Sequence, residues 1–166
     1  MEEILTTTIS IPINKLNKQN IDGIIRNKMK SLHENKCNSS GFVLKDSITI
    51  INRSMGKIIT TQSSSSVNYD VTYKSLILIP CKGDEYDCYV DSITKMGIIA
   101  YVKGYKTDDE EESLQNSPLL IIIPRDYIDP SIDISEYSND QKLKIRVLDS
   151  RSRYNSKQIQ IVGELI

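Results

Sequence analysis

Nearly all of this sequence consists of short segments with the pattern of β-strands, and one break divides them into two sets. The break is the Pro-Cys-Lys-Gly stretch at residues 80–83, where proline and glycine interrupt an apolar run. The strand pattern then restarts at residues 85–94, 97–105, 118–124, 143–149 and 158–165. Five short strands in roughly 80 residues are typical of a small OB barrel. We therefore predict a boundary at the break, with domains at residues 1–82 and 83–166.

The first half combines one helix with an antiparallel sheet. Apolar residues alternate along residues 3–13, and Pro12 cannot donate to a central ladder, so this segment is predicted to be an edge strand. Residues 20–35 place apolar side chains at helical spacing, with Asn17 or Asn20 as the N-cap. Three antiparallel strands are predicted between Gly41 and Pro80. The predicted fold is an α+β N-terminal domain, an antiparallel sheet with one helix, followed by a five-stranded β-barrel of the OB fold.

The last strand of the first half changes character along its length. Residues 67–77 alternate, and one face carries mostly Val, Tyr and Ile side chains. The opposite face is polar at first and becomes apolar at Leu76 and Leu78. We therefore expect this strand to begin half-exposed and to end covered on both faces.

The charge balance restricts how this chain could bind a nucleic acid. It has 21 basic and 22 acidic residues and a net charge of −1, so bulk electrostatics cannot hold RNA and any contact has to be local. Three cysteines without Cys-x-x-Cys spacing and a single histidine indicate neither a zinc site nor a disulfide framework. The apolar stretches are too short to cross a bilayer and the N-terminus does not resemble a signal peptide, so an intracellular protein with no membrane partner is expected.

No group of residues predicts a catalytic, metal or cofactor site. An enzyme requires a nucleophile with a base, a metal cluster or a phosphate cradle. His33 lies at the polar end of the predicted helix, where a solvated or helix-terminal role is expected. The acidic run at residues 108–112 is contiguous, so its carboxylates do not converge as in a calcium loop. It is predicted to be a solvated loop between the second and third barrel strands.

The second half contains residue types that bind single-stranded RNA. OB barrels present a sheet face and loops on which bases stack, while basic side chains contact the phosphates. The most suggestive cluster is at residues 149–158, where arginines, a lysine and a tyrosine lie within a few positions. The predicted RNA-binding residues are Tyr89, Tyr101, Lys103, Arg125, Arg146, Arg151, Arg153 and Tyr154, with Lys95, Tyr105 and Lys157 as further candidates.

Residues 80–104 resemble the start of the RNA-binding OB domain of ribosomal protein S-one and of RNA polymerase stalk subunits. Lys82-Gly83-Asp84 opens the first barrel strand, Val90 and Ile93 are expected to face the interior, and Gly97 allows the tight turn into the next strand. The first half is similar to the N-terminal domain of the stalk subunit in its order of strand, helix, Gly-Phe-Val at 41–43, Gly-Lys-Ile at 56–58 and alternating strand. With the closing residues 158–163 the resemblance covers nearly the whole chain. The family that the sequence resembles is the seventh subunit of eukaryotic-type RNA polymerase, together with its archaeal counterpart.

This resemblance implies a non-catalytic stalk subunit of a DNA-directed RNA polymerase, without a cofactor. The N-terminal half would dock on the large core subunits beside the clamp, and the barrel would touch nascent RNA. Cellular members pair with a helical fourth-subunit partner.

The sequence departs from the family at Ile99, where an aromatic residue is usual, and in its acidic loop. The short length, the AT-rich compositional bias and the divergence are typical of a copy from a large DNA virus. Such a copy can lack the helical partner and would be found in the virion and in the host cytoplasm or nucleus.

Two other functions are compatible with the sequence. A free-standing OB-fold RNA-binding or translation factor would explain residues 83–166 but would leave the first half without a role. An enzyme such as a nuclease would need a carboxylate or histidine constellation that the sequence does not supply.

Overall fold

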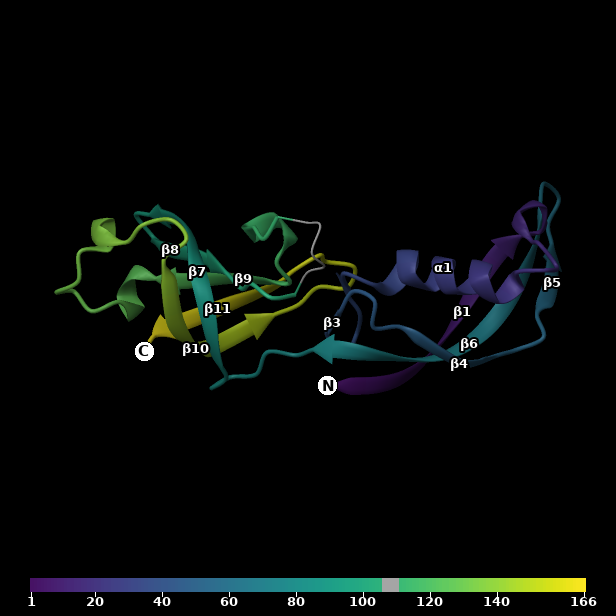
Figure 1. Ribbon diagram of the computed structural model, residues 1–166, viewed down its shortest axis with the longest axis horizontal. Helices are drawn as coiled ribbons and strands as arrows, with labels where there is room; N and C mark the ends of the chain where they lie inside the picture. The colour runs from purple at the N-terminus through teal and green to yellow at the C-terminus, as the bar shows by residue number, and fades with distance from the viewer. Residues whose placement is uncertain (106–110) are drawn as a thin grey trace. The chain divides into compact units, whose positions relative to one another are not determined.

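The computed structural model describes residues 1–105 and 111–166 and divides the chain into two compact units (Figure 1). The first unit comprises Met1–Glu34 and Val43–Ile77, and the second comprises Asn35–Phe42 and Leu78–Ile166. The first has an antiparallel sheet and one α-helix, and the second contains a closed five-stranded barrel, which confirms the predicted fold class. No helix in the described part of the chain is long and apolar enough to cross a bilayer.

The sheet of the first unit is built around the long strand β6 (Ser65–Leu78). Along one edge of β6 runs β1 (Glu2–Pro12), antiparallel and in unbroken register. The other edge of β6 pairs with β4 (Thr49–Arg53) and β5 (Lys57–Thr60), both antiparallel. The predicted edge strand and the three antiparallel strands are therefore confirmed. The two-residue strands β2 (Lys36–Cys37) and β3 (Phe42–Val43) were not predicted, because they are too short to show a period.

One face of this sheet carries the hydrophobic core of the first unit. A short 3₁₀ turn, η1 (Ile13–Lys15), leads toward α1 (Ile21–His33), which buries its apolar side against the sheet. Asn20 occupies the N-cap position, although its side chain makes no capping hydrogen bond. Burial of each large aliphatic side chain is worth about 1.5–3 kcal/mol. The core consists of Ile9, Ile11, Ile25, Met29, Val43, Ile48, Tyr69, Val71 and Tyr73.

The far end of β6 differs from the prediction. Leu76 is 45% exposed and Leu78 is only partly buried, whereas a strand covered on both faces was expected. Side chains alternate along a strand, so Leu76 lies on the face opposite to Tyr73. Because α1 packs on the Tyr73 face, its burial does not extend to Leu76.

The barrel of the second unit is closed by five strands in the order β10–β11–β9–β8–β7. They are β7 (Glu85–Thr94), β8 (Gly97–Tyr101), β9 (Leu119–Pro124), β10 (Lys142–Arg151) and β11 (Ile159–Leu165). β10 pairs with β7 to complete the circle, and β9 and β11 are parallel to each other. This order is the Greek-key arrangement of an OB fold. All five predicted barrel strands are confirmed, and β8 ends at Tyr101 rather than at residue 105.

Apolar side chains fill the barrel at alternate positions. Val90 is fully buried as predicted, whereas Ile93 is only partly buried, beyond a β-bulge between Val90 and Ser92. Gly97 begins β8 with φ of 142°, and a Cβ there would lie 2.0 Å from the carbonyl oxygen of Ile123. Only glycine fits this turn. Connections outside the strands contain the short turns η2 (Leu114–Asn116), η3 (Arg125–Tyr127) and η4 (Ile134–Glu136).

Candidate nucleic-acid interface

Four RNA-binding candidates lie together where β10 turns into β11. Arg151 ends β10, and Arg153, Tyr154 and Lys157 follow in the turn. We call these four residues the hairpin cluster. All four are exposed, Tyr154 to 71%. Their side chains form no hydrogen bond or ion pair with the described residues, so three cations and one aromatic ring are available to a ligand.

Hydrogen bonds hold the backbone of this hairpin in place. Asn155 adopts φ of 61°, a left-handed conformation that asparagine tolerates. The Ser156 N–H donates to the Arg153 carbonyl at 2.9 Å. Cys37 of β2 binds the turn twice: its N–H donates to the Ser156 carbonyl, and its carbonyl accepts from the Asn155 N–H, both at 2.8 Å. A backbone fixed in this way loses less conformational entropy when its side chains bind a ligand.

A second group of predicted residues packs together across β7 and β8. Tyr89 lies opposite Tyr101 with ring centroids 6.3 Å apart, and Lys103 Nζ is 4.2 Å from the centroid of the Tyr89 ring. Asp140 accepts the Tyr101 hydroxyl at 2.6 Å and lies 3.5 Å from Lys103 Nζ. We call these four residues the tyrosine cluster. Because Tyr101 is only 4% exposed, its ring offers no face on which a base could stack.

Titration properties of the tyrosine cluster follow from these contacts. Burial, with the hydrogen bond to Asp140 as a smaller cause, raises the pKa of Tyr101 to about 12. The same hydrogen bond, together with the charge of Lys103, lowers the pKa of Asp140. Lys103 is thus compensated by a nearby carboxylate that stays ionised at neutral pH.

The basic residues of β10 lie against carboxylates of the neighbouring strands. Lys144 Nζ is 2.7 Å from a Glu85 oxygen, and Arg146 lies 3.4 Å from both Glu85 and Glu164. The pKa of Glu85 is lowered because Lys144 hydrogen-bonds its carboxylate, with a smaller contribution from Arg146. Arg146, a predicted RNA-binding residue, is therefore already paired. We call this group the charge ladder: Lys142, Lys144 and Arg146 with Asp87, Glu85 and Glu164.

Three further candidates lie outside these groups. Lys95 is exposed in the turn between β7 and β8, and Arg125 is exposed at the start of η3, where its N–H donates to the Met96 carbonyl at 2.9 Å. Tyr105 is partly buried, and burial raises its pKa. β9 begins beside the first residue of β11 and runs parallel to it, so Arg125 follows the end of β9 that is remote from the hairpin cluster. The separation is about one strand length, roughly 17–20 Å.

The outer face of β8 and β9 is aliphatic. In OB folds the second and third strands, with the loops between strands one and two and between strands four and five, bind oligonucleotides. Here Ile99 lies opposite Ile122, and Val162 of β11 lies beside Ile122. None of these side chains can stack on a base as an aromatic ring does. The hairpin cluster occupies the loop between strands four and five, and it combines an exposed ring with charges that no carboxylate of residues 1–105 or 111–166 compensates.

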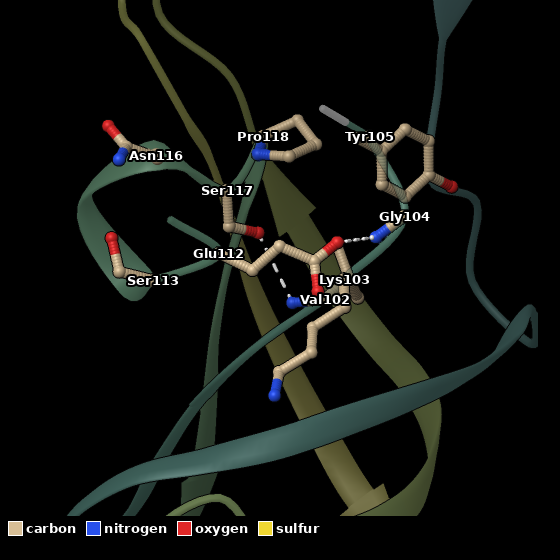
Figure 2. A pocket seen from close by; sticks show the side chains of 9 residues that line it. All are labelled: Val102, Lys103, Gly104, Tyr105, Glu112, Ser113, Asn116, Ser117 and Pro118. Atoms are coloured by element: carbon tan, nitrogen blue, oxygen red, sulfur yellow. Dashed lines mark hydrogen bonds between the residues drawn. The ribbon is translucent and has the colours of Figure 1, made fainter. Parts of the chain in front are cut away.

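The segment after β8 is closed by its own hydrogen bonds. The Gly104 N–H donates to the Glu112 carboxylate at 2.6 Å, and the Val102 N–H donates to the Ser117 hydroxyl at 3.2 Å (Figure 2). Residues 108–110 of the predicted acidic loop lie outside the described residues. Of its other members, Glu112 is committed to the backbone of Gly104. The hollow in Figure 2 is therefore an internally bonded turn and not a ligand site.

The remaining chemically reactive side chains do not form a site. Within residues 1–105 and 111–166, no three His, Cys, Asp or Glu side chains come together as metal ligands would. His33 stacks on Tyr73 with ring centroids 5.7 Å apart. Burial raises the pKa of the Cys37 thiol, and raises that of Cys88 to about 12. Both thiols are therefore poor nucleophiles.

Two contributors to these groups were missed from sequence. Asp140 has φ of 61° in a Ser-Asn-Asp turn, and this turn composition is a recognisable signal, although it does not identify Tyr101 as a partner. Cys37 lies far from the hairpin in sequence, and nothing local marks it as a support for Ser156.

No family model and no curated protein matches this sequence. The function is therefore inferred from the fold, from the three groups of residues defined above and from the resemblance in sequence.

Proposed function

We propose that this chain is a non-catalytic stalk subunit of a DNA-directed RNA polymerase. In this proposal the first unit docks on the large core subunits near the clamp, and the barrel contacts nascent RNA. Catalysis belongs to other subunits, and no cofactor is required. The protein acts inside the cell or, as a viral copy, in the virion and the host cytoplasm or nucleus, with or without a helical fourth-subunit partner.

The hairpin cluster is the observation that carries the RNA-binding part of the proposal. Its cations are exposed and form no ion pair with a described residue, and its tyrosine ring stands 71% exposed beside them. Phosphates bind such cations and bases stack on such rings without regard to sequence. In a chain with net charge −1, this contact is weak and sensitive to salt. These properties suit a subunit that must let a transcript pass.

The order of the two units supports the polymerase part of the proposal. An antiparallel sheet with one helix, followed by a closed OB barrel, is the order that the sequence resemblance implies. A free-standing OB-fold RNA-binding or translation factor could use the same hairpin. That alternative gives no role to the first unit, which has its own hydrophobic core.

Purification of the tagged full-length chain from the cells that express it tests both parts. We expect the largest polymerase subunits to be recovered with it, and photocrosslinking of thiouridine-labelled transcripts to mark the chain. Replacing Arg151 and Arg153 with Ala should leave the recovery unchanged and reduce the crosslink, whereas K144A with R146A should change neither. A monomeric chain that crosslinks to RNA without any large subunit would refute the polymerase part and favour the alternative.

A shortened chain gives a second test of docking. Residues 1–82 retain the whole first unit, so we expect them to keep the association with polymerase and to lose the RNA crosslink. The reverse piece, residues 83–166, lacks Cys37 and its two bonds to the hairpin turn. Docking by that piece alone would contradict the assigned division of roles.

A further inference from the structure

β1 offers an unpaired strand edge, and the register shows which backbone groups it presents. Met1 and Ile77 exchange two backbone hydrogen bonds, donated by the Met1 N-terminus at 2.9 Å and the Ile77 N–H at 2.7 Å. Bonded and non-bonded pairs alternate in an antiparallel ladder, and the register from Glu2 to Pro12 has no shift. The odd-numbered residues of β1 therefore bond to β6. The N–H and C=O groups of Ile4, Thr6, Thr8 and Ser10 point away from it, and no described residue pairs with them.

This edge lacks the features that usually protect an exposed strand. Proteins protect such edges with charged side chains, prolines, bulges or short length. β1 is 11 residues long, has no bulge, and carries no charge or proline from Ile4 to Ile11. Most of its side chains are the β-branched type that favours strands, and Ile4 is 64% exposed. Pro12 marks the point where pairing would stop.

A groove continues this edge at the Pro12 end. It has a volume of about 370 Å³ and lies between the end of β1 and α1. Its lining includes the apolar residues Ile11 and Ile24 and the basic residues Lys15 and Lys28. A groove between an edge strand and a helix is the setting in which an extended peptide can add to a sheet and place side chains in pockets.

The charged residues that line the groove are both lysines, and no described carboxylate compensates them. No carboxylate lines it, and neither Lys15 nor Lys28 forms an ion pair with a described residue. Three other basic residues of the first unit do have partners: Lys30 lies 2.8 Å from Asp46, Arg53 lies 2.6 Å from Asp22, and Lys74 lies 3.6 Å from Glu2. Charge complementarity therefore favours an acidic ligand at this end of the edge.

We propose that β1 accepts an extended segment of a partner protein as an additional strand of the sheet. The segment is β-branched where it pairs with Ile4 to Ser10, and it carries acidic residues at the end that meets Lys15 and Lys28. This inference does not depend on the polymerase assignment, since it rests on the edge, the groove and their charge.

A synthetic peptide provides the test, used with the full-length chain. The probe is acetyl-Thr-Val-Thr-Val-Thr-Glu-Asp-Glu, and the control probe replaces its three acidic residues with lysine. Amide hydrogen exchange followed by NMR should show the even-numbered amides from Ile4 to Ser10 slowed about tenfold by saturating probe. The amides of Leu5, Thr7 and Ile9 are already bonded to β6 and should change little. The lysine probe should leave all of them unchanged.

Two variants separate strand pairing from charge. Thr6→Pro removes an outward N–H and keeps the bonds to β6, so it should abolish binding of the probe. K15E with K28E should weaken binding about tenfold. The matched control is K18E with R26E, which makes the same charge change at exposed residues outside the groove and should have little effect. The charge-reversal pair keeps the test informative if Thr6→Pro fails to fold.

Each of four results would overturn the proposal. The probe could fail to bind at millimolar concentration, or both charge-reversal pairs could weaken it equally. An RNA oligonucleotide could compete with it, which would assign the groove to nucleic acid. The even-numbered amides could also be protected without peptide in a concentration-dependent way, which would assign the edge to a second copy of this chain.

Discussion

The two ends of β10 carry similar charge but use it differently. At the start of the strand, Lys142, Lys144 and Arg146 lie 2.7 to 3.4 Å from carboxylates of β7 and β11. At its end and in the following turn, Arg151 and Arg153 have no such partner among the described residues. In a chain whose basic and acidic residues almost balance, we therefore expect phosphate to bind where basic side chains lack a carboxylate partner, and not simply where basic residues are dense.

The charge ladder contributes little to stability, but we expect its carboxylates to disfavour RNA binding. Exposed ion pairs contribute about 0–1 kcal/mol to stability, so a phosphate could in principle displace one. A phosphate at Arg146 would, however, lie beside the carboxylates of Glu85 and Glu164, 3.4 Å from the same guanidinium. Like-charge repulsion would offset the attraction there, whereas none of the described carboxylates contacts the arginines of the hairpin cluster.

The largest effect on RNA binding should come from Arg151→Ala combined with Arg153→Ala. We expect the Kd for a single-stranded RNA decamer to rise about 30-fold, from the loss of two charge-assisted contacts. The slope of log K against log salt should become shallower by about 1.4, because each contact with single-stranded RNA contributes about 0.7. Fluorescence anisotropy at several salt concentrations measures both. K144A with R146A is the matched control, and an equal loss in that variant would remove the distinction between the two ends of β10.

Tyr154→Leu should have the next largest effect. It keeps an apolar side chain in the turn and removes the ring on which a base would stack, so the Kd should rise about fivefold, or about 1 kcal/mol. The salt slope should stay as in the unmodified chain, because no charge is lost. A changed slope, or an unchanged Kd, would show that Tyr154 does not stack on RNA.

Glu85→Gln should make the start of β10 behave more like its end. This change removes the carboxylate that Lys144 and Arg146 share. If compensation is what keeps RNA away, affinity should increase about two- to threefold, with a steeper salt slope. Asp133→Asn, which also removes an exposed carboxylate of the second unit, is the control and should have less effect. Unchanged RNA affinity in Glu85→Gln would contradict the role assigned to the ladder.

The fold could be predicted because it depends on local patterns. Alternation along β6, helical spacing in α1 and the restart after Pro80 each lie within a few consecutive residues. The alternation pattern predicted burial wrongly at Leu76, because burial there depends on which face of the sheet a distant element covers. The apolar character of Leu76 is visible in the sequence, but the position of α1 on the opposite face is not.

The candidate site was less predictable, because its residues differ in their partners and not in their type. Arg146 and Arg153 are both arginines in a basic region, and only the register of β10 with β7 and β11 places carboxylates against Arg146. Tyr101 and Tyr154 are likewise the same residue type with opposite exposure, 4% and 71%. Tertiary pairing decides both differences, and this pairing cannot be read from the local patterns of a single sequence.

The tyrosine cluster should influence stability with pH more than RNA binding, and this is the smallest effect we expect. The pKa of Asp140 is lowered by the Tyr101 hydroxyl and by Lys103. Its contribution is therefore complete above its ordinary pKa of 3.8 and is lost as the pH falls through the lowered value. The pKa of Tyr101 is raised from 10.0 to about 12, so its contribution to stability is complete below pH 10 and is lost toward pH 12.

Asp140→Asn should weaken the dependence of thermal unfolding on pH at both the acidic and the alkaline end, and it should leave the Kd for RNA nearly unchanged. Tyr101→Phe should likewise weaken the dependence in acid, because the same hydrogen bond is removed. An unaltered pH dependence in both variants would contradict the bond, and a large loss of RNA affinity would move the binding site from the hairpin cluster to the tyrosine cluster.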